Sequence, residues 1–504
     1  MRISVARVFY TICFCILFIR NLASGQVNVS NLAEYQAGNL PDTSPRNLTT
    51  LYNSLNLNYQ KEMINASFKF ERFQHENPTN AYSELTQKSI SLNQGGIGIT
   101  IGNFYEIFGR GLLLRSFEIQ GNILEDIIYR TRYGFYRDID GLLVKYQAQN
   151  LEIKLLHGRP LFNVLPPTFA SDRRRPTLLE GIETNVTIAE NYTLGSAYLR
   201  ENDNDKLQEY GSVSFSANMP GEMQIYSEYA QRFNGNQDLF SLRDKTAHAL
   251  YAGANTIFGP VGLSFEIKDY INFLLNFNDP PPIVKEHQYI VLNRSTHVIE
   301  PLYETGWQAE ALYTSQGGHQ FTVNFAESTN KLLNKDATFK EFFTEASIHL
   351  TEGTFGKFFF DLSNDPFKFE KDRFALGTYL SQNWHNNWGT TIGLEFQRFE
   401  RNLLSVQQIE NTAVTLEISH SPTYTAGIIW ERSTDPDLTD AFTTPQVENN
   451  ARNWLAVSIG SQIDQNHFLN LFYGKRRGGP ACTSGICYNV LDFEGFEMRL
   501  SSHF

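Results

Sequence analysis

The sequence predicts an all-β protein, a transmembrane antiparallel β-barrel with an even number of strands, about 20 to 26. Three observations predict this class. Apolar and polar residues alternate with period two along most of the chain, the connections alternate between short and long, and the last strand ends on an aromatic residue. Short periplasmic turns at one end and long extracellular loops at the other are typical of outer-membrane barrels.

The first 25 residues read as a secretory signal peptide. Arg2 and Arg7 precede an apolar stretch from Val8 to Ile19, and small residues at 23–25 suit a signal peptidase. Twelve apolar residues are too few to span a bilayer about 30 Å thick as a helix, which makes a retained anchor the weaker interpretation. We therefore expect cleavage after Gly25, which leaves residues 26–504 as the barrel.

Composition limits the class of the mature protein. Cleavage would remove three arginines and no acidic residue, and so change the net charge from −12 to −15. This acidity disfavours a nucleic-acid partner, which would require a basic face. Beyond the signal peptide we find no apolar run long enough for a transmembrane helix. The alternative to a barrel is a soluble secreted all-β protein with aromatic cores or sugar-stacking residues.

Strands and connections follow one another in a regular order. Alternation is seen, for example, at Leu151, Ile153 and Leu155, where polar residues separate the apolar ones. Tight turns are predicted at 219–221, 258–260, 316–318, 352–353, 420–422 and 464–466. Longer polar connections are predicted at about 159–177, 231–245, 270–303, 327–339, 400–411, 432–451 and 475–490.

The C-terminal strand supplies an independent argument. Phe496, Met498 and Leu500 alternate with polar residues, and the chain ends at Phe504. This pattern resembles the terminal strand that the barrel insertion machinery of the bacterial outer membrane reads. If Phe504 lies at the periplasmic end, the turn at 464–466 is periplasmic and the connection at 475–490 is extracellular.

Charged residues lie within and after a glycine-rich segment at 101–115. We interpret them as candidate charges of the lumen, where they would form an inward polar network or a selectivity ring. Salt bridges that only fill the wall are an equally good reading. The candidates are Glu106, Arg110, Arg115, Glu118, Arg130 and Arg132.

The connection at 270–303 is too apolar to extend into water. We hypothesise that it folds into the barrel mouth as a constriction, or that it forms a surface for a partner. The alternative is that part of it extends the neighbouring strands. The residues that carry this hypothesis are Phe273, Phe277, Pro281, Asn293 and Arg294.

Cys482 and Cys487 would be the two cysteines left after cleavage, in an exported setting that permits disulfides. A disulfide that rigidifies the last outer loop is the favoured interpretation, since two thiols with no nearby histidine make a poor zinc site. Acidic residues at 201–205 and 435–440 are more readily solvated loop acids than calcium ligands. We find no local catalytic motif, and so we expect no enzyme activity, cofactor or metal.

The stretches Gly102–Glu106 and Phe108–Leu112, the tripeptide Leu292–Arg294, and Gly478–Gly479 with the two cysteines resemble a family of Bacteroidota outer-membrane proteins, domain of unknown function 6029. The resemblance covers nearly all of the mature chain. It implies an outer-membrane barrel and supplies no catalytic residues.

Three functions are compatible with such a barrel. The first is a passive channel or transporter for small solutes. The second is a non-conducting barrel that anchors or assembles surface proteins through its outer loops. The third, an embedded hydrolase, is less favoured. In each case we expect contact with outer-membrane lipid and lipopolysaccharide, and in the second a surface protein partner.

Overall fold

The fold is that of a computed structural model of the chain. It describes residues 25–39, 47–126, 130–161, 167, 174, 176–204, 206–233, 247–281, 285–297, 302–332, 335–403, 406–435, 451–483 and 486–504, with the backbone alone at 481–483, 486, 487 and 489. The predicted signal peptide lies outside these residues except for Gly25.

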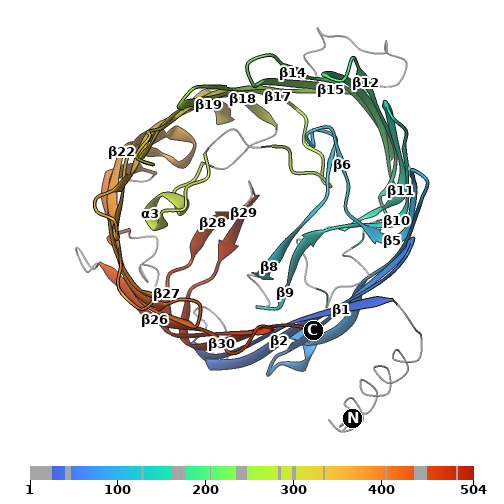
Figure 1. The fold of residues 1–504 in the computed structure, drawn as a ribbon. Coiled ribbons are helices and arrows are strands. Elements are labelled where there is room, and N and C mark those ends of the chain that lie inside the picture. Colours follow the sequence, from blue (N-terminus) through green and yellow to red (C-terminus); the bar gives the residue numbers. More distant parts are fainter. Residues whose placement is uncertain are drawn as a thin grey trace.

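A closed antiparallel barrel of 24 strands forms the wall in the described part of the chain, and this confirms the predicted fold class. It closes because β1 pairs with both β2 and β30, the last strand (Figure 1). Closure leaves no strand edge unpaired. The wall strands are β1 (Gln26–Asn39), β2 (Asn47–Lys61), β3 (Ile64–Gln74), β4 (Tyr82–Gln94), β5 (Ile97–Phe104), β10 (Ile139–Gln147), β11 (Leu151–Pro160), β12 (Leu178–Ile188), β13 (Tyr192–Asp203), β14 (Lys206–Met219), β15 (Met223–Phe233), β16 (His248–Phe258), β17 (Val261–Ile271), β18 (Tyr303–Thr314), β19 (Gln320–Leu332), β20 (Lys335–His349), β21 (Thr354–Asp365), β22 (Glu370–Asn383), β23 (Trp388–Asn402), β24 (Val406–His420), β25 (Tyr424–Ser433), β26 (Arg452–Gln462), β27 (His467–Arg476) and β30 (Phe493–His503).

Side chains alternate between the two faces of the wall. In β23, Ile392 and Leu394 are exposed on the outside, whereas Glu395 and Gln397 are buried in the interior. The same alternation puts exposed apolar side chains on the outer face of most strands. An apolar exterior around a polar interior is the arrangement that a barrel needs in hydrocarbon.

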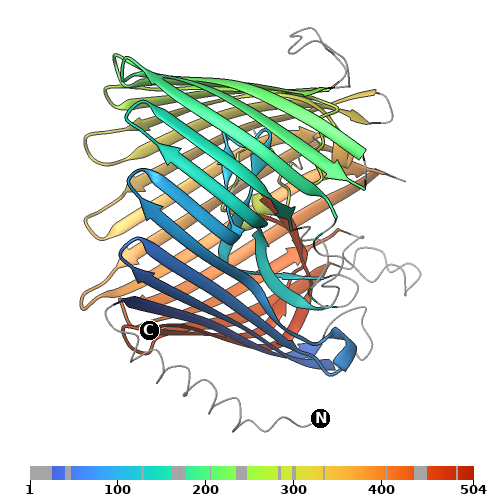
Figure 2. The same ribbon diagram turned by 90° about the vertical axis from the view of Figure 1, so that its right-hand side faces the viewer.

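The two ends of the barrel differ, as Figure 2 shows. One end has tight turns such as Gly95–Gly96, whose φ values of 57° and 82° suit a two-residue hairpin. The C-terminus lies at this end, because the amide of Val29 donates to the carbonyl of Phe504 at 3.0 Å and that of His503 donates to Asn466 at 2.9 Å. The turn at 464–466 and the C-terminus therefore share one end.

The terminal strand has the two faces that its pattern predicts. Met498 is exposed on the outside, whereas Glu497 accepts a hydrogen bond of 2.6 Å from Gln36. Phe496 and Leu500 have the same parity as Met498, and Phe504 is 65% exposed at the end of the chain. A role for these residues in insertion stays a prediction.

Two connections predicted to be long are short. The segments 327–339 and 400–411 belong mainly to β19, β20, β23 and β24, and only 333–334 and 403–405 separate these strands. The physical reason is the outer face of these strand ends. Outward positions there carry exposed polar residues such as Lys331 and Asp336, and so the apolar alternation that identifies a strand is weak.

Three of the long connections at the other end fold into the barrel instead of extending away from it (Figure 1). We name them insert 1 (residues 105–138), insert 2 (residues 272–302) and insert 3 (residues 477–492). They contain β6 (Ile107–Phe108), β7 (Leu114–Arg115), β8 (Phe117–Glu125), β9 (Arg132–Arg137), α3 (Ile290–Asn293), β28 (Gly479–Thr483) and β29 (Ile486–Val490), while η1 (Pro78–Asn80) and η3 (Pro366–Lys368) lie in wall connections. Among the described residues, no helix is long and apolar enough to cross a membrane.

Candidate functional site

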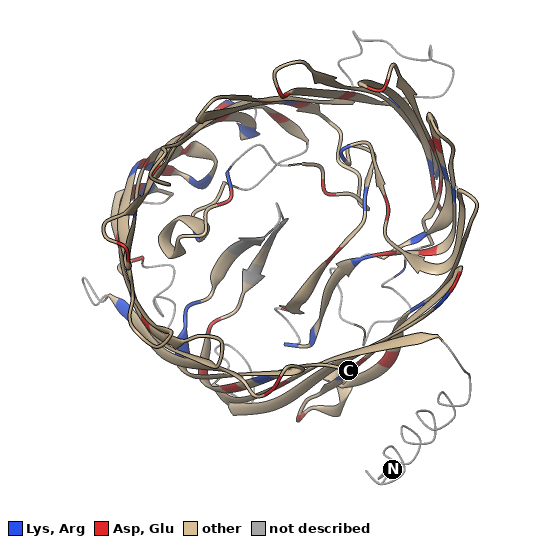
Figure 3. Ribbon diagram, viewed as in Figure 1, with Lys and Arg blue, Asp and Glu red and all other residues tan. Residues whose placement is uncertain are grey.

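The lumen, with its three inserts, is the candidate functional site. Charged residues occur both along the inserts and around the surrounding wall (Figure 3). The inserts contact the wall through apolar packing, hydrogen bonds and ion pairs in different proportions.

Insert 1 is anchored by an apolar hairpin. In it, Phe108 pairs with Leu114 across β6 and β7, and the turn between them contains Gly109 and Gly111 at φ values of 55° and 94°. Leu112, Leu113, Leu114 and Phe108 are buried in one cluster with wall residues such as Leu156, Leu179 and Leu199. A Cβ added to Gly181 of the wall would lie 2.9 Å from the ring of Phe108, and so the glycine makes room for it.

Wall carboxylates bind the backbone of the same hairpin. The amide of Gly109 donates to Glu183 at 2.5 Å, and that of Arg110 donates to Glu228 at 2.8 Å. Lys154 lies 2.8 Å from Glu183 and partly balances its charge. Charge-assisted bonds of this kind are stronger than neutral ones, and they fix the hairpin tip on the wall.

All six predicted lumen charges lie in insert 1, and not in a ring on the wall. Three take part in ion pairs with wall residues: Glu106 with Lys145 at 2.5 Å and Lys154 at 3.2 Å, Glu118 with Lys69, and Arg132 with Glu34. Arg130 pairs with Glu125 of the same insert at 2.8 Å. Arg110 lies over the ring of Tyr226 at 5.0 Å, and Arg115 over Phe117 at 6.0 Å.

Glu71 of β3 is a further wall residue that holds insert 1 in place, and it was not among the residues predicted from the sequence. Its carboxylate accepts from the wall hydroxyl of Tyr52 at 2.6 Å and, in insert 1, from the amide of Gly134 at 2.9 Å and the hydroxyl of Tyr136 at 2.8 Å. Its signal in the sequence is an acidic residue at an inward position of a strand. Many inward acids share that signal, and only the fold selects those that meet an insert.

The first part of insert 2 packs on insert 1. Phe273, Leu275 and Phe277 are buried in the cluster that holds the insert 1 hairpin. The side-chain amide of Asn278 donates to the carbonyls of Gly111 at 2.8 Å and Leu112 at 2.9 Å. Two further bonds fix the segment that follows: Asp279 with Arg137 at 2.8 Å, and the carbonyl of Pro281 with the hydroxyl of Tyr270 at 3.1 Å.

The second part of insert 2 is held by polar groups of the wall. Glu395 accepts from the amides of Ile290 at 3.1 Å and Val291 at 2.9 Å, at the start of α3. Arg294 donates to both oxygens of Glu431, at 3.0 and 2.9 Å. Asn293 donates to the carbonyl of His287 at 2.9 Å and so closes the loop before α3.

Insert 3 contacts both of the others. Arg294 of insert 2 donates to the carbonyl of Gly478 at 3.3 Å, and the ring of Phe135 in insert 1 lies edge-on to Tyr488 at 5.2 Å. Burial, together with the nearby Arg294 guanidinium, lowers the pKa of Arg477 to about 10. The three inserts therefore form one connected body inside the barrel.

The backbone of insert 3 brings the two cysteines together, because Cys482 pairs with Cys487 in the β28–β29 hairpin. Their side chains lie outside the described residues, and so the disulfide stays a prediction. The hairpin lies inside the ring, and this differs from the exposed outer loop that we expected.

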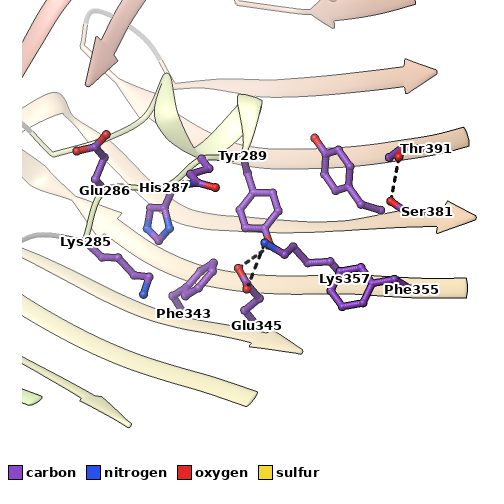
Figure 4. A pocket seen from close by; sticks show the side chains of 12 residues that line it. Lys285, Glu286, His287, Tyr289, Phe343, Glu345, Phe355, Lys357, Ser381 and Thr391 are labelled. Carbon is purple, nitrogen blue, oxygen red and sulfur yellow. Dashed lines mark hydrogen bonds and ion pairs between the residues drawn. The ribbon is translucent and has the colours of Figure 1, made fainter. Parts of the chain in front are cut away.

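Two cavities border the inserts. One, of about 520 Å³, lies between insert 2 and strands β20 to β23, and Figure 4 shows Tyr289, Lys357 and Glu345 in it. There the hydroxyl of Tyr289 donates to Glu345 at 2.6 Å. The other, of about 660 Å³, is lined by Glu106, Arg110, Arg115 and Lys154 among others. Both cavities combine aromatic or apolar surface with charged groups, the kind of lining that binds small polar molecules.

Comparison with known proteins gives a family and several distant structures. The model of a family of unknown function, DUF6029, matches residues 8–504. A search of curated proteins found no match. The P pilus usher (PapC) translocation pore is similar over 95% of this chain and 99% of its own, with 8% identity and a TM-score of 0.46. OccK3 (OpdO) of Pseudomonas aeruginosa is similar over 96% of this chain and 97% of its own, with 10% identity and a TM-score of 0.39. OccAB3 of Acinetobacter baumannii is similar over 95% of this chain and 99% of its own, with 10% identity and a TM-score of 0.34.

Proposed function

This chain belongs to DUF6029, a family of unknown function, and we propose that it is an outer-membrane barrel that passes small solutes along a narrow polar route between its inserts and its wall. The observation that carries the proposal is the lumen. Inserts bound by ion pairs narrow it, yet they leave charged cavities of about 520 and 660 Å³ beside the wall.

The chemistry of the two faces supports the proposed location. Exposed apolar side chains, such as Ile101, Leu194 and Ile392, cover the outside of a closed sheet. In water such a surface would associate with other proteins, whereas in a bilayer it is matched by lipid. Outer-membrane lipid and lipopolysaccharide are therefore the proposed surroundings, and export through the signal peptide and the insertion machinery is the proposed route.

The selectivity of the route is proposed to come from the inserts. Charged side chains in a lumen control which solutes pass without the energetic cost of facing lipid. Arg110 and Arg115 line the cavity beside insert 1, together with Glu106. A solute that passes there meets both signs of charge, which favours small zwitterionic or polar solutes over a single class of ion.

The test is single-channel conductance of the purified mature protein in a planar bilayer, with only preparations whose gel mobility changes on boiling. We expect small stepwise openings from the wild type, and larger ones when residues 273–281 are replaced by a shorter Gly-Ser linker. Asp336→Asn, in an exposed pair with Lys331, is the matched control and should leave conductance unchanged. Equal conductance of the linker variant and the wild type would contradict the proposed route.

A non-conducting barrel that anchors or assembles surface proteins is the second candidate. The observation that favours it is that contacts of Asn278, Arg294 and Phe135 connect the three inserts into one body inside the barrel. Folded protein that shows no openings, together with a surface protein co-purifying with it, would favour this candidate over the channel.

A further inference from the structure

We propose that His287, Glu341 and Asp361 bind one divalent transition-metal ion, such as Zn²⁺, and that this ion fixes insert 2 to the wall. The site goes beyond the proposed function, since it requires no transport. It also revises the expectation from the sequence that the chain holds no metal.

The three residues come from separate parts of the fold. His287 belongs to insert 2, Glu341 to β20 and Asp361 to β21. Glu341 is paired with Ser363 and Asp361 with Phe343, and so the two carboxylates are diagonal neighbours on the inward face of two adjacent strands. The residues are 3%, 3% and 0% exposed, and one ligand atom from each lies within 4.8 Å of the others.

Polar atoms at this site are buried without hydrogen-bond partners. Within the described residues this holds for Nδ1 of His287, for Oε2 of Glu341 and for Oδ2 of Asp361. Nε2 of His287 lies 3.2 Å from Oε1 of Glu341 without the geometry of a hydrogen bond. The second oxygen of Asp361 is satisfied, because it accepts from Ser363 at 2.9 Å. A buried polar atom with no partner costs about 1–3 kcal/mol, and a shared cation would remove that cost at all three side chains.

The surrounding charges leave room for a dication. Ion pairs link Glu341 and Asp361 to Arg373, at 3.7 and 3.9 Å. Arg373 contacts Glu370, which contacts Arg401, and Arg401 contacts Asp435. The ion pairs named here join four carboxylates and two guanidinium groups. A divalent ion would add positive charge where the carboxylates outnumber their partners.

A neighbouring histidine offers a contrast on the same insert. His297 is also buried, and its Nδ1 lies 2.9 Å from Oδ2 of Asp365, which is a direct one-to-one pair. His287 also has one carboxylate close to a ring nitrogen, because its Nε2 lies 3.2 Å from Oε1 of Glu341, but a second carboxylate, that of Asp361, lies within reach of the same group of ligand atoms. The second carboxylate is the difference that indicates a ligand role for His287.

The ligand set selects the class of ion. An imidazole nitrogen with carboxylates suits Zn²⁺ or Mn²⁺, whereas Mg²⁺ and Ca²⁺ prefer oxygen ligands. Bond lengths to zinc would bring the ligand atoms to roughly 3.4 Å from one another, a change within reach of small side-chain rotations. His287 also lines the cavity of about 520 Å³, which gives the ion a path to the site.

The experiment measures zinc in the folded full-length barrel. Protein stripped with a chelator is reloaded with Zn²⁺, passed through a desalting column and analysed by inductively coupled plasma mass spectrometry. We expect close to one zinc ion per chain in the wild type, and affinity at least about tenfold weaker in His287→Ala and in Glu341→Gln, which keeps the shape of the side chain. Zinc should also raise the temperature at which the gel mobility of the wild type changes, and should do so less in the variants.

His297→Ala is the matched control and should bind zinc like the wild type. Heat-dependent gel mobility shows which variants fold, and Glu341→Gln keeps the test informative if His287→Ala does not. A folded wild type with no more zinc than Glu341→Gln would overturn the proposal. Equal loss of zinc in His297→Ala would also overturn it, because the ion would then not be specific to the His287 site. Neither outcome depends on conductance. The metal site is therefore tested separately from the proposed channel function.

Discussion

Two segments of the lumen differ in the balance of apolar and polar contacts that hold them. The hairpin of insert 1 is buried mainly through Phe108, Leu112, Leu113 and Leu114, in a large apolar cluster against the wall, and two of its amides donate to wall carboxylates. The second part of insert 2, residues 285–297, buries Tyr289, Val291 and Leu292 in a smaller cluster with the wall. It is also held by ion pairs and hydrogen bonds to Glu395, Glu431 and Arg373, so that polar contacts form a larger share of its attachment.

The difference teaches how a wide barrel can hold loops of unequal mobility. Apolar burial adds up over many atoms and does not depend on the ionisation of any one group. A polar network loses much of its stability when one partner is removed or replaced, because the other partner stays buried and uncompensated. Insert 1 is therefore expected to be the more firmly fixed part of the lumen, and residues 285–297 the part whose attachment depends more on single polar contacts.

The largest effect is expected from Leu113→Ala. Leu113 is fully buried, and loss of a buried leucine side chain costs about 3 kcal/mol. Insert 1 should then become more accessible, which is measured by protease cleavage within residues 105–138 of the folded barrel. Leu350→Ala makes the same change at a turn residue that is 51% exposed and should have little effect. Equal cleavage in both variants would contradict the claim that apolar burial fixes insert 1 against the wall.

A smaller effect is expected from Arg294→Met. The substitution leaves Glu431 without its bidentate partner, although Arg477 remains 3.9 Å away and moderates the loss to about 2 kcal/mol. We expect faster hydrogen exchange in residues 285–297 and little change in insert 1. In the double variant with Glu431→Gln, the loss should be smaller than the sum of the two single losses, since the unpaired carboxylate is gone. Additive losses would show that the pair is not coupled.

The barrel itself could be predicted from the sequence because the hydrocarbon of a bilayer permits few backbone structures. Every backbone group in hydrocarbon must be paired, and so the apolar alternation of residues such as Ile392 and Leu394 indicates both a strand and its outer face. Where the outward residues are polar, as at Lys331 and Asp336 in the predicted loop 327–339, the same rule fails, and the structure has strands there.

The lumen could be predicted only in part. Residues 270–303 are too apolar for water, and the structure places the described part of insert 2 inside the ring, while residues 270–271 and 303 extend the neighbouring strands β17 and β18. The apolar hairpin of insert 1 has no comparable signal, because its partners Glu183 and Glu228 lie 74 and 118 residues away in the chain. Contacts at such separation are set by closure of the barrel, and no local spacing records them.

The smallest effect is expected from Glu395→Gln. This substitution tests whether the hydrogen bonds from Glu395 to the start of α3 help to hold insert 2. Glutamine keeps one oxygen that can accept from the amide of Ile290 or Val291 but presents its NH₂ group to the other, and so we expect a loss of about 1 kcal/mol. Hydrogen exchange at the start of α3 should quicken about fivefold, since 1 kcal/mol corresponds to that factor. Glu417→Gln is the matched control, because Glu417 is exposed on the neighbouring strand and its charge holds no insert. If Glu395→Gln left the exchange of residues 285–297 unchanged while Arg294→Met accelerated it, insert 2 would be held at its Arg294 end alone. The bonds from the start of α3 to Glu395 would then contribute nothing to holding insert 2, and the ion pair between Arg294 and Glu431 would be the polar contact that matters.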